Sequence, residues 1–259
     1  MSLQAVIFDV DGTLAETEEL HRAAFNQAFA EAGEDWVWDR ELYAQLLEVE
    51  GGAARLRAYV EQARPRELAR LENDGAFEAI HARKTEVFQA LVEEGARLRP
   101  GVARLLSDIR SSGMKLAVCT TSGRETFEGL ILNAFGFEAL DWFAAAVTRE
   151  DVAAVKPDPA PYLATLERLG VPAQAAMVVE DSGRGVASAR AAGIETVAAP
   201  GLYTRGDDFT GALLTLSDLG EPSEPFEVLA GDPGPFSYVG ADALHYWHAC
   251  SCGTEGAAA

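Results

Sequence analysis

The chain has 259 residues, of which 48% are hydrophobic, so it can fold around a sizeable core. Asp and Glu number 41 against 21 Lys and Arg, a formal net charge of −20 that disfavours nucleic acid and anionic membranes as partners. Three cysteines provide no disulfide framework, and the sequence shows no leader-like or membrane-spanning apolar stretch. We expect a cytoplasmic monomer.

The first element expected in chain order is a buried strand at 3–8, an apolar run that ends at Asp9. From residue 16 to about residue 98, apolar residues recur at helical spacing among Ala, Glu, Leu and Arg, which predicts an all-helical segment. After Arg99-Pro100-Gly101 helices and strands alternate. Strands are expected at 115–119, 143–147, 175–179 and 195–198, and helices at 102–112, 125–134, 160–169 and 186–192.

Apolar strands that alternate with helices predict an α/β fold, with a doubly wound parallel sheet covered on both faces. The predicted domains are an α/β core at 1–15 and 99–220, a helical insertion at 16–98 and a C-terminal extension at 221–259. Residues 221–235 are rich in Pro, Gly and acids and predict a loop, whereas residues 242–249 are compatible with a short helix.

Polar residues follow four of the expected strands at the point where each strand ends. They are Asp9 and Asp11 after the first strand, Thr120, Thr121 and Ser122 after the second, Lys156 after the third, and Glu180 and Asp181 after the fourth. In open α/β sheets, ligands bind outside the carboxyl ends of the strands. A single strand-ending Asp is often only a helix cap, but the combination at one edge of a sheet favours a functional site.

The four acids at this edge indicate a metal ion. Two carboxylates about 4 Å apart repel by roughly 4 kcal/mol at an effective dielectric near 20, so gathering several without a counter-ion would cost much of a typical folding free energy. A hard divalent cation removes this difficulty, and Mg²⁺ is the usual choice where phosphate completes the coordination. The expected cofactor is therefore Mg²⁺, with ligands among Asp9, Asp11, Glu180 and Asp181.

These segments also resemble a known family. Phe8-Asp9-Val10-Asp11-Gly12-Thr13-Leu14 is similar to the first signature of the haloacid-dehalogenase-like phosphotransferases. The strand that ends in Thr120, the segment Val155-Lys156-Pro157-Asp158 and the segment Val179-Glu180-Asp181-Ser182 resemble the second, third and fourth signatures. The resemblance covers about residues 3–198 and implies a Rossmann-like core with an inserted helical cap.

The resemblance also implies a role for each matching residue. Asp9 would attack phosphorus and Asp11 would be the general acid/base. Thr120 and Lys156 would bind the phosphoryl oxygens, while Glu180 and Asp181 would serve the magnesium, with Asp181 the favoured direct ligand.

The chemistry of a phosphate ester agrees with these roles. A carboxylate nucleophile divides hydrolysis into two steps through an acyl phosphate. The departing alkoxide needs a proton. Proton donation by a general acid typically accelerates such a reaction by about 10²- to 10⁴-fold. A halide leaves without a proton, so an acid at position 11 favours phosphoryl transfer over dehalogenation.

A narrower resemblance lies in the helical insertion. The run from Phe8 to Phe25, the Gly-Gly-x-x-Arg step at 51–55, the His-x-Arg-Lys cluster at 81–84 and the segment at 207–211 are similar to the CbbY family, whose function is the hydrolysis of xylulose 1,5-bisphosphate. The resemblance implies contacts to a sugar bisphosphate from Glu16, His21, Gly52, Arg55 and Lys84. We add Thr121, Ser122 and Arg124 to the expected substrate-binding residues.

Several alternatives stay open from the sequence. Glu16 and His21 also suit the first turns of a solvated helix, Arg55 could pair with a surface Glu, and Arg124 could cap a helix. A β-phosphoglucomutase-like isomerase shares the core signatures, and a phosphoglycolate or broad sugar-phosphate phosphatase is a further candidate. A non-catalytic scaffold is disfavoured, because all the catalytic carboxylates and the lysine are present.

Overall fold

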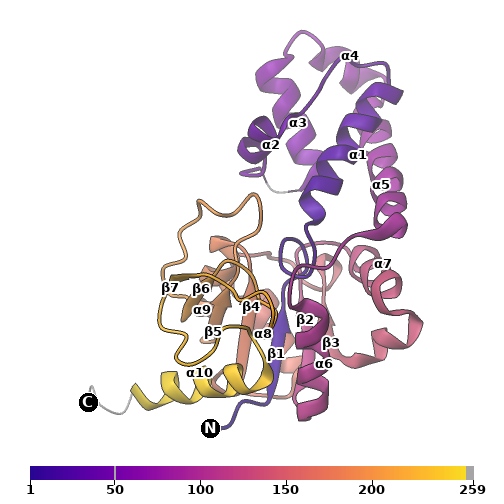
Figure 1. Ribbon diagram of the computed structural model, residues 1–259. Coiled ribbons are helices and arrows are strands. Elements are labelled where there is room, and N and C mark those ends of the chain that lie inside the picture. The colour runs from indigo at the N-terminus through magenta and orange to yellow at the C-terminus, as the bar shows by residue number, and fades with distance from the viewer. Residues whose placement is uncertain (50, 255–259) are drawn as a thin grey trace. The chain divides into compact units, whose positions relative to one another are not determined.

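The structure is a computed structural model that describes residues 1–49 and 51–254, and the chain divides into two compact units (Figure 1). The core unit comprises Met1–Glu16 and Arg97–Ala259, and the helical unit comprises Thr17–Ala96. In chain order, the core unit contains β1 (Ala5–Phe8), α6 (Val102–Ser112), β2 (Lys115–Cys119), α7 (Arg124–Phe135), η1 (Phe137–Trp142), β3 (Phe143–Val147), η2 (Arg149–Asp151), α8 (Ala160–Leu169), η3 (Ala173–Ala175), β4 (Ala176–Glu180), α9 (Gly183–Ala191), β5 (Glu195–Ala198), β6 (Leu214–Leu216), β7 (Val228–Ala230) and α10 (Ala241–Thr254).

The core unit is built on a seven-stranded sheet with the order β3-β2-β1-β4-β5-β6-β7. Strands β1 to β6 are parallel, and β7 is antiparallel to β6. Every residue of β1 and β4 is buried, which explains why both strands are continuous apolar runs without alternation. Helices α8 and α9 pack on one face of the sheet, and α6 lies across the opposite face with α10 beside it (Figure 1).

The predicted fold class is confirmed, and three predicted strands, at 115–119, 143–147 and 195–198, have the observed bounds. Two strands were not predicted. β7 lies inside the predicted loop at 221–235; it is a three-residue edge strand whose residues are all exposed, so it carries no burial pattern. Helix α10 is longer than the predicted helix at 242–249, and Ala243, Leu244 and Trp247 on it are buried.

The core unit is interrupted by the insertion between residues 16 and 97, and its two chain ends at this point lie together. An antiparallel bridge joins Ala15 to Leu98, and the Arg99 backbone N–H donates to the Leu14 carbonyl at 2.9 Å. The chain therefore leaves and re-enters the core unit at neighbouring positions.

The helical unit contains α1 (Thr17–Glu31), α2 (Arg40–Leu46), α3 (Gly52–Ala63), α4 (Leu68–Asn73) and α5 (Ala76–Gly95). Its centre is aromatic: Trp38 contacts Phe25, Phe29 and Tyr59 with ring centroids 4.5–5.3 Å apart. Trp36 and Trp38 are buried in a segment without regular structure. Among the described residues, none of the helices combines the length and the apolar character needed to cross a membrane.

Candidate active site

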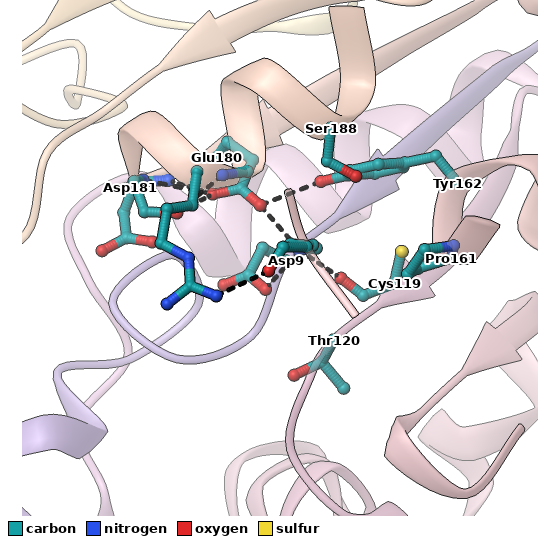
Figure 2. Close-up of polar contacts among 12 residues, drawn as sticks. Asp9, Cys119, Thr120, Pro161, Tyr162, Glu180, Asp181 and Ser188 are labelled. Carbon is teal, nitrogen blue, oxygen red and sulfur yellow. Dashed lines mark hydrogen bonds and ion pairs between the residues drawn. The ribbon is translucent and has the colours of Figure 1, made fainter. Parts of the chain in front are cut away.

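Three buried carboxylates meet at the carboxyl ends of β1 and β4 (Figure 2). Asp9 follows β1, Glu180 ends β4 and Asp181 comes next; one oxygen of each lies within 4.8 Å of the others. The two strands are neighbours with Phe8 paired to Val179, so both end at the same height in the sheet. We call Asp9, Glu180 and Asp181 the acidic site.

Lys156 joins the acidic site from the loop after β3. Its Nζ donates to Asp9 Oδ1 at 2.7 Å, to Glu180 Oε1 at 2.6 Å and to the Cys119 carbonyl at the end of β2 at 2.8 Å. Helix α9 fixes this loop from outside, because the Arg184 guanidinium donates to the Lys156 carbonyl at 2.8 Å. The ends of β1, β2 and β4 and the loop after β3 therefore converge on one ammonium group, as the sequence predicts.

The acidic site holds more negative charge than the protein neutralises by direct contact. Burial raises the pKa of Asp9 to about 8, and repulsion from Glu180 and Asp11 adds to this, although Lys156 acts in the opposite direction. Burial, then Glu180 and Asp9, raise the pKa of Asp181 well above its usual value. Burial disfavours the charge on Lys156, but the two carboxylates outweigh it and raise the pKa of this lysine. A metal site with an all-oxygen donor set fits these observations.

Glu180 already has donors on both oxygens. Oε1 accepts from Lys156 and from the Tyr162 hydroxyl at 2.9 Å, while Oε2 accepts from the Asp181 and Ser182 backbone N–H groups and from the Ser182 hydroxyl. Gly185 is required beside it, because a Cβ there would lie 1.8 Å from Glu180 Oε1. Figure 2 shows Tyr162 reaching Glu180 from α8. The Glu180 carboxylate is thus held in one position.

Asp11 lies against the segment that follows β2. The Ser122 hydroxyl donates to Asp11 Oδ2, and the Ser122 backbone N–H donates to Thr120 Oγ1 at 3.0 Å. Thr120 is buried and Thr121 is exposed. The structure therefore brings Asp11, Thr120 and Ser122 together beside the acidic site.

Arg124 and Glu16 lie in other surroundings. The Arg124 guanidinium pairs with Asp151 Oδ2 at 2.9 Å, and its backbone N–H donates to Glu150 at the start of α7. Glu16 belongs to the core unit: its Oε1 lies 3.4 Å from Arg99 Nε, and its Oε2 accepts from the Leu202 backbone N–H at 3.3 Å. Both side chains have protein partners here, and their contact with substrate stays a prediction.

A second group of cations lies within the helical unit. Lys84 is buried, and its Nζ lies 2.8 Å from His21 Nδ1 and about 5 Å from the ring centroids of Phe25 and Phe88. An ammonium group has no acceptor, so Nδ1 accepts and the ring proton of neutral His21 lies on Nε2. Burial, followed by Lys84, Arg55 and His81, lowers the pKa of His21 well below its usual value.

We call His21, Arg55, His81 and Lys84 the basic cluster. Arg55 is buried, and its guanidinium donates to the Leu46 carbonyl and to the Tyr43 hydroxyl, both at 3.1 Å. Gly52 lies next to the cluster, because a Cβ there would be 2.9 Å from His81 Nε2. The structure thus brings together the predicted residues His21, Gly52, Arg55 and Lys84 of the helical unit.

Three residues with contacts in this region were missed by the sequence reasoning. Tyr162 lies on the buried face of α8 and resembles any core aromatic residue. Arg99 donates to the carbonyls of Gly12, Ala199 and Pro200. Thr204 lies in the segment after β5. Polar residues that follow a strand of an open α/β sheet are candidates for the site, and this signal also applies to Thr204.

Comparison with known proteins gives concordant matches. A model of the haloacid dehalogenase-like hydrolases matches residues 3–193. The plasmid-encoded protein CbbY of Cupriavidus necator is 43% identical over 95% of this chain and 97% of its own length.

Two crystal structures of CbbY from Rhodobacter sphaeroides are also similar. One contains phosphate; it is 40% identical, covers 83% of this chain and 94% of its own, and has a TM-score of 0.73. The other is an aspartate-to-asparagine variant with xylulose-(1,5)bisphosphate; it is 39% identical, covers 85% and 98%, and has a TM-score of 0.74.

Proposed function

Since this chain belongs to the haloacid dehalogenase-like hydrolases, and within them to the CbbY family, we propose that it is a Mg²⁺-dependent phosphatase that hydrolyses xylulose 1,5-bisphosphate through a phosphoaspartate at Asp9. The relative that was crystallised with xylulose-(1,5)bisphosphate supports the choice of substrate.

The observation that carries the chemistry is the triple contact of Lys156 with Asp9, Glu180 and the end of β2. Three buried carboxylates against one ammonium group in direct contact leave an uncompensated charge of about −2 when all are ionised, which a divalent cation would neutralise. Asp9 and Asp181 would hold Mg²⁺. When bound, Mg²⁺ supplies the positive charge that lets a carboxylate approach a phosphoryl group.

The residues of this chain then divide the reaction between them. Asp9 attacks phosphorus with one carboxylate oxygen, and Lys156 donates to the phosphoryl oxygens that gain charge. Asp11, oriented by the Ser122 hydroxyl, gives a proton to the departing sugar oxygen and later takes one from the water that cleaves the acyl phosphate. Thr120 offers a hydroxyl donor beside them.

The basic cluster suggests which part of the substrate the helical unit recognises. Arg55 and Lys84 are buried cations, and the pKa of His21 is lowered first by burial and then by their charge. A second phosphate group would relieve this positive charge, whereas a neutral sugar end would not. We therefore assign the basic cluster, together with Gly52, to the distal phosphate of a sugar bisphosphate, and Glu16 to its hydroxyl groups.

A phosphate-release screen tests the proposal. Xylulose 1,5-bisphosphate, ribulose 1,5-bisphosphate, hexose phosphates and phosphoglycolate are compared with and without Mg²⁺. We expect the highest kcat/KM with xylulose 1,5-bisphosphate and no turnover after chelation of the metal. A preference for phosphoglycolate would contradict the assigned substrate. Conversion of β-glucose 1-phosphate to glucose 6-phosphate, with a trace of bisphosphate present, would show a mutase instead.

A further inference from the structure

Glu180 and Asp181 are adjacent in the chain but differ in what holds them. The Glu180 carboxylate accepts hydrogen bonds on both oxygens, as described above. Asp181 Oδ2 accepts from a single side chain, the Thr204 hydroxyl, at 3.0 Å, and no donor among the described residues reaches Oδ1. The Asp181 carboxylate therefore depends on one hydroxyl group, Thr204, for its orientation. The Glu180 carboxylate has several donors and depends less on each of them.

The direction of the Thr204 hydroxyl is fixed by its other contact. The Gly201 backbone N–H donates to Thr204 Oγ1 at 2.8 Å. A hydroxyl group has one proton, and because its oxygen accepts from Gly201, that proton is available for Asp181. Thr204 thus acts as an oriented donor to one particular oxygen.

The segment that carries Thr204 is fastened on both sides. Arg99 is buried and donates to the carbonyls of Ala199 and Pro200, which lie just before it. On the other side, Asp207 Oδ2 accepts from the Gly183 backbone N–H at the start of α9. The turn after β5 is therefore fixed to the same helix that follows Asp181.

Two glycines make room for this arrangement. A Cβ at Gly12 would lie 2.1 Å from Asp181 Oδ2, and a Cβ at Gly201 would lie 3.2 Å from the same oxygen. Oδ2 is thus enclosed by two stretches of backbone and one hydroxyl group, whereas the Cβ at Gly12 would lie 3.3 Å from Oδ1, and we assign Oδ1 to the cation. Groups that hold a metal ligand in this way typically change metal affinity 10- to 100-fold when they are removed.

We propose that Thr204 is a positioning residue for the metal ligand Asp181, and that its hydroxyl sets the affinity of the site for a divalent cation. This inference rests on the metal site of the proposed function. Thr204 would act through Asp181, without contacting the metal ion or the substrate.

The test measures metal binding without turnover. Mn²⁺ is titrated into the full-length protein and the free ion is followed by electron paramagnetic resonance, with Mg²⁺ added as a competitor. We expect Thr204→Val to weaken binding by roughly 10- to 100-fold and Thr204→Ser, which keeps the hydroxyl, to stay within about threefold of the wild type. Steady-state kinetics should show a higher Mg²⁺ requirement for Thr204→Val, with kcat recovered at saturating Mg²⁺.

Thr196→Val is the matched control. Thr196 lies on β5, its hydroxyl is buried, and that hydroxyl has no hydrogen-bond partner among the described residues. This variant makes the same chemical change in the same region and should bind Mn²⁺ as the wild type does. Thr204→Ala replaces the valine variant if the latter does not fold.

The possible results distinguish the absence of a metal site from the absence of a role for Thr204. If the wild-type protein binds no Mn²⁺, the proposed metal site itself is wrong. A wild type that binds Mn²⁺, with Thr204→Val or Thr204→Ala binding it equally well, would overturn the role of Thr204 alone. Equal weakening by Thr196→Val would also overturn it, because the effect would then be structural.

Discussion

The two units of this protein each contain a buried lysine, and the two lysines have different neighbours. Lys156 of the core unit lies 2.6–2.7 Å from two carboxylates, so its charge is neutralised within the protein. Lys84 of the helical unit contacts an imidazole nitrogen and two phenyl rings. Under the proposed function, Lys156 would be a donor next to the nucleophile, and Lys84 would contribute to binding a phosphate group of the substrate.

Under the proposed function, the core unit carries out the reaction and the helical unit recognises the substrate. In the core unit the grouped side chains are carboxylic acids, and burial, followed by repulsion between the carboxylates, raises the pKa values of Asp9 and Asp181. In the helical unit the functional groups are bases, and the pKa of His21 is lowered. Burial is the largest cause of both shifts, and it favours the neutral acid in the core unit and the neutral imidazole in the helical unit.

The strongest test of the core unit is Asp9→Asn. We expect the rate of phosphate release to fall by roughly 10⁴-fold or more, because an amide cannot form the acyl phosphate. The thermal midpoint should not fall, since the change removes one of three crowded carboxylates. Asp141→Asn, at an exposed position, is the control and should keep wild-type activity. Substantial turnover by Asp9→Asn would exclude Asp9 as the nucleophile.

Substituting the two lysines compares the units directly. Lys156→Met should lower kcat by about 10²- to 10³-fold on every substrate, and it should destabilise the fold by about 3–5 kcal/mol because Asp9 and Glu180 lose their partner. Lys84→Met should instead raise KM for the bisphosphate by roughly 10- to 100-fold, the value of one charged hydrogen bond.

The choice of substrate distinguishes these effects. With p-nitrophenyl phosphate, which has a single phosphate, Lys84→Met should behave as the wild type, whereas Lys156→Met should still be impaired. If Lys84→Met lowers kcat equally on both substrates, the division between chemistry and recognition is wrong.

Tyr162→Phe probes how the acids of the core unit are held. The change removes one of the two donors to Glu180 Oε1, and we expect kcat to fall about tenfold with KM little changed. Thr165→Val on the same helix is the control, because the Thr165 hydroxyl donates to the Pro161 carbonyl within α8 at 2.8 Å. Equal kinetics for the two variants would show that the Tyr162 hydroxyl has no part in catalysis.

The smallest expected effect is the pH dependence of stability caused by His21. Its pKa is lowered in the folded protein, so below about pH 6.5 the unfolded chain takes up a proton that folded His21 does not. The free energy of unfolding should therefore decrease as the pH falls through this region, by at most about 1.4 kcal/mol per pH unit.

Denaturation at a series of pH values measures this effect as a difference between variants. His21→Gln should reduce the loss of stability between pH 7 and pH 5 relative to the wild type. His245→Gln, at an exposed position on α10, should not. Identical curves for wild type and His21→Gln would mean that His21 is not buried as a neutral ring.

The sequence predicted most strands of the core unit, and it predicted some but not all of the residues that contact the acidic site. Continuous apolar runs such as 116–119 identify buried parallel strands, and acids at the ends of β1 and β4 identify the acidic site. Tyr162 could not be found in this way, because nothing in the sequence distinguishes an aromatic residue that donates to Glu180 from one that only fills the core.

β7 could not be found either, since a three-residue exposed edge strand depends on its partner β6 rather than on its own pattern. Within the helical unit, the sequence identified the Gly-Gly-x-x-Arg step and the cluster at 81–84. The resemblance assigned His21 and Lys84 to the same substrate, but the sequence did not show that the two side chains, 63 positions apart, would contact each other. Such pairings depend on how α1 packs against α5, which local spacing does not specify.

The bridge between Ala15 and Leu98 has a practical consequence for protein engineering. Because the two strands of chain run antiparallel and in contact at that point, a short turn could connect residue 16 to residue 97 and yield a core without its insertion. The same junction could receive a foreign insert with little distortion of the sheet. Chimaeras built there would keep the acidic site and exchange the helical unit, and so would test whether that unit determines the choice of substrate.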